Sequence, residues 1–115
     1  MEPELCFKAL ADPVRVGVLR LLTLEGELCV CELTHALHEI LPRISRHLAL
    51  LKEAGLVLDE RRGQWVHYRI NPALPAWFVE GLAVVVRGLS TRKRCSADQR
   101  TLTGELNRRG GACCA

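Results

Sequence analysis

The sequence has no hydrophobic run long enough to cross a membrane. The longest apolar stretches of the 115 residues, such as Leu82–Val86, are far shorter than the roughly 20 residues that a spanning helix needs. The first residues, MEPELCFK, are acidic where a secretion signal requires a basic flank followed by a long apolar core. We therefore expect a cytoplasmic protein, whose reducing surroundings keep its six cysteines as free thiols or ligands.

Several hallmarks of enzymes and of repeat proteins are also missing. The chain contains no internal repeat and no Gly-rich loop that would cradle a phosphate. It contains no Cys/His pairing of the kind that activates a thiol nucleophile, so a small thiol enzyme such as a reductase is disfavoured. A chain of this length forms one domain with a single modest core, and we expect it not to be an enzyme.

The net charge of +3 is unevenly distributed along the chain. Residues 1–41 contain three lysines and arginines against seven acidic residues, a balance of −4. Residues 42–72 contain six against three, a balance of +3, and residues 87–115 contain seven against two, a balance of +5. A basic middle segment indicates a polyanionic partner, although a modest basic excess is also common on ordinary protein surfaces.

Capping residues and apolar spacing predict four helices in the first half of the chain. Asp12 and Pro13 suit the N-cap and the first position of the second helix, and Gly26 suits its end. The fourth helix carries a basic face beside its apolar stripe. The expected segments are a short helix around Leu5, Phe7 and Leu10, a second from Pro13 to Gly26, a third at residues 30–38 and a fourth from Pro42 to Gly55.

After Gly55 the apolar pattern changes from a helical period to strict alternation. The segment LVLDERRGQWVHYRI predicts two antiparallel strands around a turn at residues 61–64. A last helix is expected from Pro75 to about Leu89. Its broad apolar face consists of Trp77, Phe78, Leu82, Val85 and Leu89.

Composition divides the chain into two parts. Residues 1–90 contain all of the expected helices and strands and would form the folded domain. Residues 91–115 are rich in Arg, Ser, Thr and Gly, and they are expected to form a basic, flexible tail that contains Cys95, Cys113 and Cys114.

Two short adjacent helices followed by a basic hairpin are the order of elements in a winged helix-turn-helix, so the expected fold is mainly α with a small β-hairpin. The major groove of DNA admits one α-helix, and side chains near the N-terminus of that helix reach base edges. Arg46 could pair with guanine, whereas Arg43 and Ser45 could equally hold phosphates. The residues expected to contact double-stranded DNA are Arg43, Ser45, Arg46 and His47 in the fourth helix and Arg61, Arg62 and Gln64 in the hairpin.

Taken singly, each of these features also fits an amphipathic helix with a solvated basic face or an ordinary polar turn. Taken together, in this order and within 30 residues, they favour DNA binding. An operator with two half-sites matches a two-fold protein, so we expect a homodimer. The last helix offers the dimer surface and the first helix is its natural companion, although Trp77 and Phe78 could instead complete the core of the monomer.

Four segments match a known family in order and spacing. They read ALADPVRVGVLRLL, ELCVCEL, ISRHLALLKEAGLV and GQWVHYRI. Together they resemble the arsenical-resistance repressors of the ArsR/SmtB family, and the resemblance covers roughly residues 5–90. It implies a homodimeric winged-helix repressor that leaves its operator DNA when a metalloid or metal binds. The inducer motif of the family, a CVC at the start of the third helix, falls on Cys29 and Cys31.

The spacing of Cys29 and Cys31 raises a mechanical question. Residues two apart on an α-helix point about 200° away from each other, so we expect the two thiols to lie on opposite sides of the third helix. They would then bind one ion only if the first turn of that helix unwinds, which would displace the fourth helix. The alternative interpretation is that both cysteines are small buried hydrophobic residues.

The resemblance also leads us to expect three sulfur ligands, and the third is open. The family pattern CVCDLC would place a cysteine at Thr34, and a hydroxyl is a poor ligand for a soft ion. A two-thiol site would suit a methylated trivalent arsenical, which offers only two bonds to sulfur. The candidate ligands are Cys29 and Cys31 first, Cys95, Cys113 and Cys114 of the tail second, and Cys6 of the partner protomer, as in the cadmium- and lead-responsive branch, third.

Three regulatory functions follow from these motifs. The first is a transcriptional repressor induced by trivalent arsenic, as arsenite or a methylated arsenical. The second is a DNA-binding regulator whose thiols, Cys113 with Cys114 or Cys29 with Cys31, form a redox switch. The third is a cadmium- or lead-responsive repressor of the same family.

Overall fold

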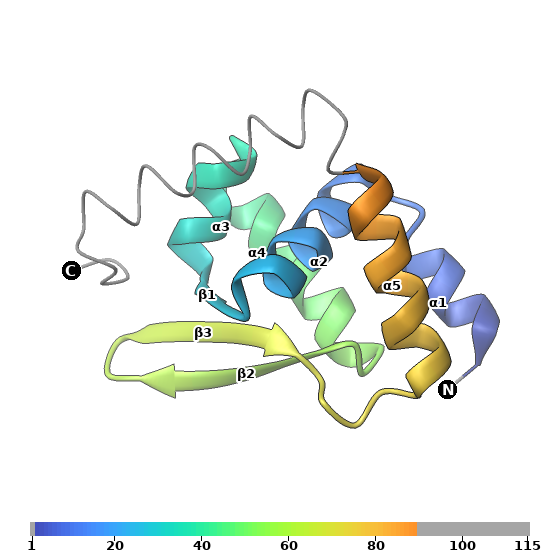
Figure 1. The fold of residues 1–115 in the computed structure, drawn as a ribbon. Helices are drawn as coiled ribbons and strands as arrows, with labels where there is room; N and C mark the ends of the chain where they lie inside the picture. The colour runs from blue at the N-terminus through green and yellow to red at the C-terminus, as the bar shows by residue number, and fades with distance from the viewer. Residues whose placement is uncertain (1, 90–115) are drawn as a thin grey trace.

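A computed structural model describes residues 2–89 of the chain. The elements run in the order α1 (Pro3–Ala9), α2 (Pro13–Glu25), β1 (Glu27–Cys29), α3 (Val30–Leu37), α4 (Leu41–Glu53), β2 (Val57–Arg62), β3 (Trp65–Ile70) and α5 (Ala76–Leu89). The helices lie together on one side of a small sheet whose strand order is β1-β3-β2 (Figure 1). The expected mainly helical fold with a small β component is therefore confirmed.

The second helix begins and ends where its capping residues predict. The carboxylate of Asp12 accepts hydrogen bonds from the backbone N–H groups of Val14, at 2.8 Å, and Arg15, at 3.3 Å. Gly26 ends the helix with a φ of +87°, a conformation that costs glycine little because it has no Cβ. The position of α2 matters because α3 and α4 both pack against it.

Helices α3 and α4 form a helix-turn-helix joined by a short turn. His38 ends α3 in a left-handed conformation with a φ of 54°, which lets the chain reverse within a few residues. Helix α4 begins at Leu41, one residue before the expected Pro42, because proline occupies its second position. Ile40 stands at the N-cap of α4, and its side chain makes no capping hydrogen bond.

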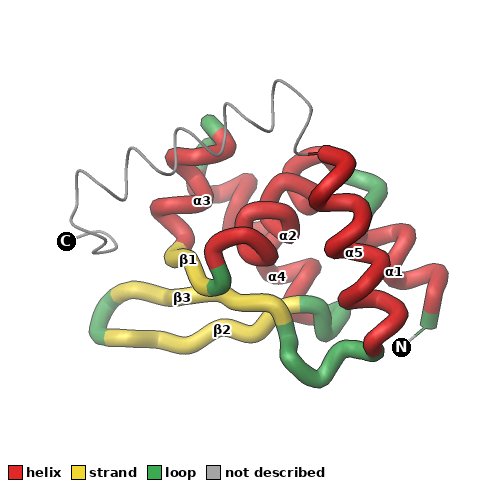
Figure 2. The backbone as a smooth tube through the Cα atoms, in the orientation of Figure 1, coloured by secondary structure: helices red, strands yellow, loops and turns green. Residues whose placement is uncertain are grey.

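The predicted hairpin is present, and a third strand joins it. Strands β2 and β3 pair antiparallel from Val57 opposite Ile70 to Arg62 opposite Trp65, so only residues 63–64 form the tip. The third strand, β1, was not expected from the sequence and pairs with the other edge of β3 (Figure 2). Its pairing places Cys29 opposite His67. A strand of three residues is too short to show an alternating pattern of its own.

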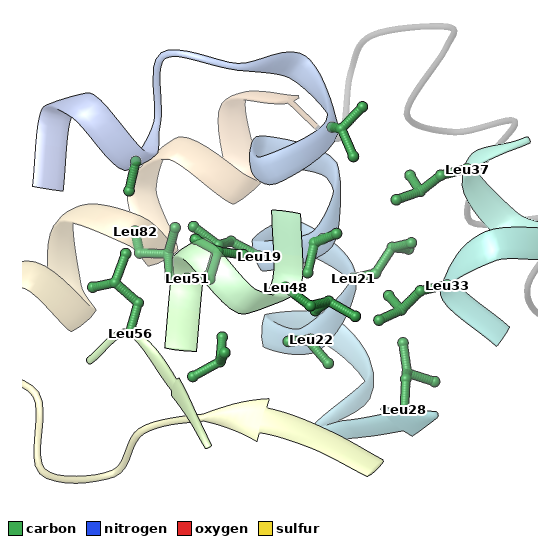
Figure 3. Packing of buried hydrophobic residues seen from close by; sticks show 14 of the residues in the cluster. Leu19, Leu21, Leu22, Leu28, Leu33, Leu37, Leu48, Leu51, Leu56 and Leu82 are labelled. Carbon is green, nitrogen blue, oxygen red and sulfur yellow. The ribbon is translucent and has the colours of Figure 1, made fainter. Parts of the chain in front are cut away.

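The hydrophobic core lies between the helices and the sheet. Leu19, Leu21 and Leu22 of α2 are almost fully buried, and they lie among leucines of α3 and α4 (Figure 3). Burying one leucine side chain contributes about 1.5–3 kcal/mol to folding. The core therefore fixes the recognition helix α4 and its supporting helix α3 on one rigid scaffold.

The last helix is only half buried. Phe78 and Leu82 lie in the core, as the apolar pattern predicts. Trp77 and Val85 belong to the same expected apolar face, yet they are 50% and 42% exposed. Within residues 2–89 no helix is long and apolar enough to cross a membrane. The predicted tail, residues 91–115, lies outside the described residues, so the domain boundary stays a prediction.

Candidate nucleic-acid interface and thiol site

Three of the four residues expected to contact DNA from the fourth helix are exposed at its start. Arg43, Ser45 and Arg46 all face solvent in the first turns of α4, while the neighbouring Ile44 is buried. The guanidinium of Arg43 lies 3.4 Å from the carboxylate of Glu39, one turn earlier. An exposed pair of this kind contributes little to stability and leaves Arg43 able to exchange partners. This end of α4 can therefore offer donors to an anion or to a base edge.

The fourth residue, His47, is buried and does not belong to this exposed surface. Its side chain is only 5% exposed because it faces α2 from the buried side of α4. Nη1 of Arg15 lies 3.2 Å from Nδ1 of His47, and the carboxylate of Asp12 lies 3.7 Å from Nε2. Since arginine only donates, Nδ1 accepts and the neutral ring carries its proton on Nε2. His47 thus joins the recognition helix to the start of α2.

The surroundings of His47 favour its neutral form. Burial lowers the pKa of the imidazole, the Asp12 carboxylate partly opposes this, and the positive charge of Arg15 lowers the pKa further. Arg15 also donates from Nε to the carbonyl of Ala9, at 2.9 Å, and from Nη2 to that of Lys8, at 3.1 Å. One arginine therefore ties the end of α1 to the recognition helix. In the sequence His47 reads as part of a basic helix face, whereas in the fold it packs against α2.

The two arginines at the end of β2 differ in their contacts. Arg61 and Gln64 are exposed, and Nε of Arg61 donates to the carbonyl of Gly63 at 3.2 Å. Arg62 instead forms a two-pronged ion pair with Glu27 of β1, and its Nη2 also lies 3.3 Å from the carboxylate of Glu60. Two carboxylates therefore neutralise Arg62, which the sequence analysis placed among the DNA contacts.

Glu27 is a site residue that the sequence analysis missed. It holds Arg62 and also lies 3.6 Å from Nδ1 of His67, so it connects β1 to both strands of the hairpin. No local pattern could have indicated this role, because Arg62 lies 35 residues further along the chain. The hairpin of β2 and β3, which is the wing of this fold, is thereby joined to β1, the strand that ends at Cys29.

The two thiols of the motif lie together, and the expectation that they point to opposite sides is wrong. The sulfur atoms of Cys29 and Cys31 are 2.9 Å apart. This separation is longer than the ~2.05 Å of a disulfide bond. The reason is that α3 begins at Val30, so Cys29 is its N-cap, with extended backbone (φ −86°, ψ 164°). The 200° rule holds between two helical residues and does not apply to a residue that precedes the helix.

A buried carboxylate supports the start of α3. Oε1 of Glu32 accepts a hydrogen bond of 2.9 Å from the backbone N–H of Cys29, and the Cys29 sulfur faces the N–H of Glu32, which completes a capping box. Cys29 is fully buried and Cys31 is partly exposed, so the pair is open to solvent on one side.

The other proposed ligands are arranged differently. Thr34 donates from its hydroxyl to the carbonyl of Val30 at 2.6 Å, an ordinary contact within a helix. Cys6 is buried in the core, where burial raises the pKa of its thiol. Cys95, Cys113 and Cys114 lie outside the described residues. Within residues 2–89 no group of three or more Cys, His, Asp or Glu side chains is arranged to hold a metal ion.

A separate apolar surface lies on the first and last helices. Leu5 and Phe7 of α1 are 49% and 73% exposed, and Trp77, Val84 and Val85 of α5 are at least 42% exposed. Both helices lie on the right of the molecule in Figure 1. Exposed apolar side chains that gather over neighbouring elements are typical of a protein–protein contact.

Relatives in sequence include regulators of arsenic resistance. The sequence model of the family described as "Bacterial regulatory protein, arsR family" matches residues 12–58. An arsenical resistance operon repressor from Escherichia coli strain K12 is 46% identical over 111 residues, which cover 87% of this chain and 94% of the repressor. The arsenic resistance transcriptional regulator ArsR1 of Pseudomonas putida is 56% identical over 77 residues, covering 67% of this chain and 60% of ArsR1.

Solved structures agree with the sequence comparison. The homodimeric winged helix-turn-helix DNA-binding domain of Mb0332 from Mycobacterium bovis matches with a TM-score of 0.63 and 31% identity, covering 76% of this chain and 77% of that one. The antimony-specific transcriptional repressor AntR matches with a TM-score of 0.63 and 27% identity over 74% of each chain. The winged helix-turn-helix fold expected from the sequence is confirmed, and the chain belongs to the arsR family of bacterial regulatory proteins.

Proposed function

We propose that this protein is a transcriptional repressor that binds operator DNA as a homodimer and releases it when a trivalent arsenical binds to Cys29 and Cys31. The observation that carries the proposal is the contact between the two sulfur atoms, 2.9 Å apart at the first residue of the helix-turn-helix. Relatives named as arsenical resistance repressors support the same inducer class.

The DNA half of the proposal rests on the start of α4 and on the wing. Arg43, Ser45 and Arg46 are exposed where a recognition helix meets base edges, and Arg61 and Gln64 are exposed at the wing. Arg46 is assigned to guanine and Arg43 to a phosphate. Arg62 is removed from the set of contacts because Glu27 and Glu60 would have to leave before a phosphate could replace them.

The thiol pair fits a soft, thiophilic inducer. Both sulfurs lie next to each other at the start of α3, and thiol sulfur is a preferred ligand of soft ions. Two sulfurs satisfy a methylated trivalent arsenical, whereas arsenite would take one more ligand. Cys6 is the weakest candidate for that ligand because its thiol lies in the core. Cys95, Cys113 and Cys114 stay candidates for arsenite.

The coupling between inducer and DNA follows from the double role of Cys29. This residue ends β1, caps α3 and shares a capping box with Glu32. Drawing its sulfur into a new bond withdraws it from the backbone N–H of Glu32, so the first turn of α3 loses its cap. Because Leu33 and Leu37 of α3 are buried in the core that also contains α4, the recognition helix shifts with it.

The dimer is assigned to the apolar side chains of α1 and α5. Phe7 and Trp77 are the largest of them, and aromatic residues are enriched in protein interfaces. A two-fold axis through this surface would present two recognition helices to two half-sites of one operator. A regulator of this kind acts in the bacterial cytoplasm and is not an enzyme.

The same sulfur contact also favours a second function, a redox switch in which a peroxide oxidises Cys29 and Cys31 to a disulfide. One experiment separates the two. The full chain is bound to a fluorescent operator duplex and is titrated with arsenite in the presence of a reductant, and separately with hydrogen peroxide in its absence. Release by arsenite in the presence of a thiol reductant supports the repressor proposed above. Release by peroxide alone, reversed by the reductant, would assign the thiols to redox sensing.

A further inference from the structure

The recognition helix begins with a group of exposed apolar residues that no role described so far explains. Ile40 is 68% exposed and Leu41 is 51% exposed, and Pro42 beside them also faces solvent. They stand at the N-cap and the first two positions of α4, immediately before Arg43. Single exposed apolar residues are common on protein surfaces, but three in a row at a functional helix end are not.

Pro42 suits the first turn of α4, but the helix gains no cap from Ile40. Ile40 occupies an N-cap with extended backbone, where Ser, Thr, Asp or Asn would accept a hydrogen bond from the helix, and its own side chain accepts none. Its exposed apolar surface is also unfavourable in water. Ile40 neither caps the helix nor enters the core. We therefore infer that its side chain contacts a partner outside this chain.

The dimer surface assigned above does not reach this end of α4. Leu5 and Ala9 of α1 line a pocket together with Leu50 and Leu51, which lie in the last turn of α4. An α-helix rises 1.5 Å per residue, so about 15 Å separate Leu51 from Leu41. Figure 1 shows α1 and α5 on the right of the molecule and α3, which leads into the turn before α4, on the left.

Charge identifies the partner of the apolar group. Arg43, Ser45 and Arg46 follow it on the same exposed end of α4, and residues 42–72 carry a net charge of +3. An apolar tip followed by two exposed arginines, the first of which pairs with Glu39, suits the floor of the DNA major groove, where phosphates flank base edges. Among the four bases only thymine presents a methyl group there, and apolar side chains recognise it by contact.

We propose that Ile40 and Leu41 read thymine, each packing against the C5-methyl group of a thymine in an operator half-site. The inference rests on the proposed DNA binding and deepens it, because it names the bases read by residues other than arginine. The side chains of a recognition helix that come first in the chain reach the base edges. Ile40 and Leu41 would therefore contact bases while Arg43 holds a phosphate.

The test removes only the methyl groups from the DNA. The full chain selects a tight-binding duplex from a random pool, and each thymine of that duplex is then replaced in turn by deoxyuridine. Burying one methyl-sized group corresponds to about a fourfold change in affinity. We expect one or two replacements in each half-site to weaken binding by about that factor, and the others to have no effect, in fluorescence anisotropy.

Variants connect the lost affinity to the two side chains. In Ile40→Ser/Leu41→Ala, serine supplies the missing cap, so α4 is expected to stay folded by circular dichroism. This variant should bind the thymine and deoxyuridine duplexes equally well. Leu24→Ala, which removes a leucine of similar exposure to Leu41 from α2, is the matched control and should keep the full sensitivity to the methyl groups.

The outcomes separate this inference from the function on which it rests. If the chain binds the duplex and releases it with arsenite, yet no deoxyuridine replacement weakens binding, the thymine contact is refuted while the repressor stands. The thymine contact would also be refuted if Ile40→Ser/Leu41→Ala lost as much affinity on deoxyuridine replacement as the wild type does. A change in the oligomeric state of this variant would refute it too, because it would assign the two residues to a protein contact. A chain that selects no duplex would overturn both proposals.

Discussion

The two helices of the helix-turn-helix begin in contrasting ways, although neither begins with an ordinary capping residue. The N-cap of helix α3 is Cys29, which is fully buried and shares a capping box with Glu32. The N-cap of helix α4 is Ile40, which is 68% exposed and makes no capping hydrogen bond. Serine or aspartate would stabilise either end more, by about 1 kcal/mol.

The difference shows what each end contributes to function. At the start of α3 the residue that replaces a normal cap is a thiol, and it lies where two secondary structure elements meet. At the start of α4 the replacement is an apolar side chain that faces outward beside Arg43. The first end is suited to sensing a ligand and transmitting strain, and the second is suited to meeting DNA. Changes at α3 should therefore alter release, and changes at α4 should alter affinity.

The largest expected effect comes from Cys29→Ser. Serine is a good N-cap, so we expect the fold and the affinity for operator DNA to be preserved. A hydroxyl is a poor ligand for a soft ion, and even altering a ligand's supporting partner costs 10–100-fold in affinity. The arsenite concentration that releases half of the DNA should rise more than ~100-fold in an anisotropy titration. Cys6→Ala is the control, and normal release by Cys29→Ser would move the inducer site elsewhere.

Arg46→Ala tests the start of α4 and should have the next largest effect, which is on DNA affinity. If Arg46 pairs with guanine, its loss costs about 1–3 kcal/mol of discrimination between the operator and unrelated DNA. The arsenite concentration that releases half of the bound DNA should be unchanged. Competition binding against both duplexes measures this. Equal weakening on both duplexes would make Arg46 a phosphate contact instead.

In the wing, Arg61 and Arg62 are expected to differ in their contribution to DNA binding, with a smaller effect. Arg61→Ala should lower the slope of log affinity against log salt concentration by about 1, because one phosphate contact is lost. Arg62→Ala should leave that slope nearly unchanged, since Glu27 and Glu60 already neutralise the side chain. Binding isotherms at several salt concentrations provide the measurement. Equal slopes for both variants would contradict the distinction between the two arginines.

The smallest expected effect is a pH dependence of stability from His47. The folded state lowers the pKa of this histidine from its usual 6.5, so the unfolded chain binds the proton more readily. Stability is therefore full above pH 6.5 and is lost as the pH falls below that value. Urea unfolding of the wild type and of His47→Gln, from pH 7.5 to pH 5, should show a steeper decline for the wild type. Parallel curves would mean that the His47 pKa is unchanged by folding.

Much of the fold followed from local signals in the sequence. Asp12, Pro13 and Gly26 mark the ends of α2, and the change of period after Gly55 marks the hairpin. The direction of the thiols did not follow, although the third helix begins at residue 30 as expected, because Cys29 then precedes the helix as its cap and the 200° separation of helical residues does not apply to it. The burial of His47 and the pairing of Glu27 with Arg62 depend on partners 32 to 35 residues away. Such contacts leave no trace in local spacing.

The central claim is that inducer binding at Cys29 removes the cap of α3 and thereby displaces α4. Amide hydrogen exchange of the full chain, with and without arsenite under reducing conditions, tests it most directly. The account predicts faster exchange at residues 30–33 and in the first turns of α4, with little change in the middle of α2. Unchanged exchange at residues 30–33, with a response confined to residues 91–115, would contradict it.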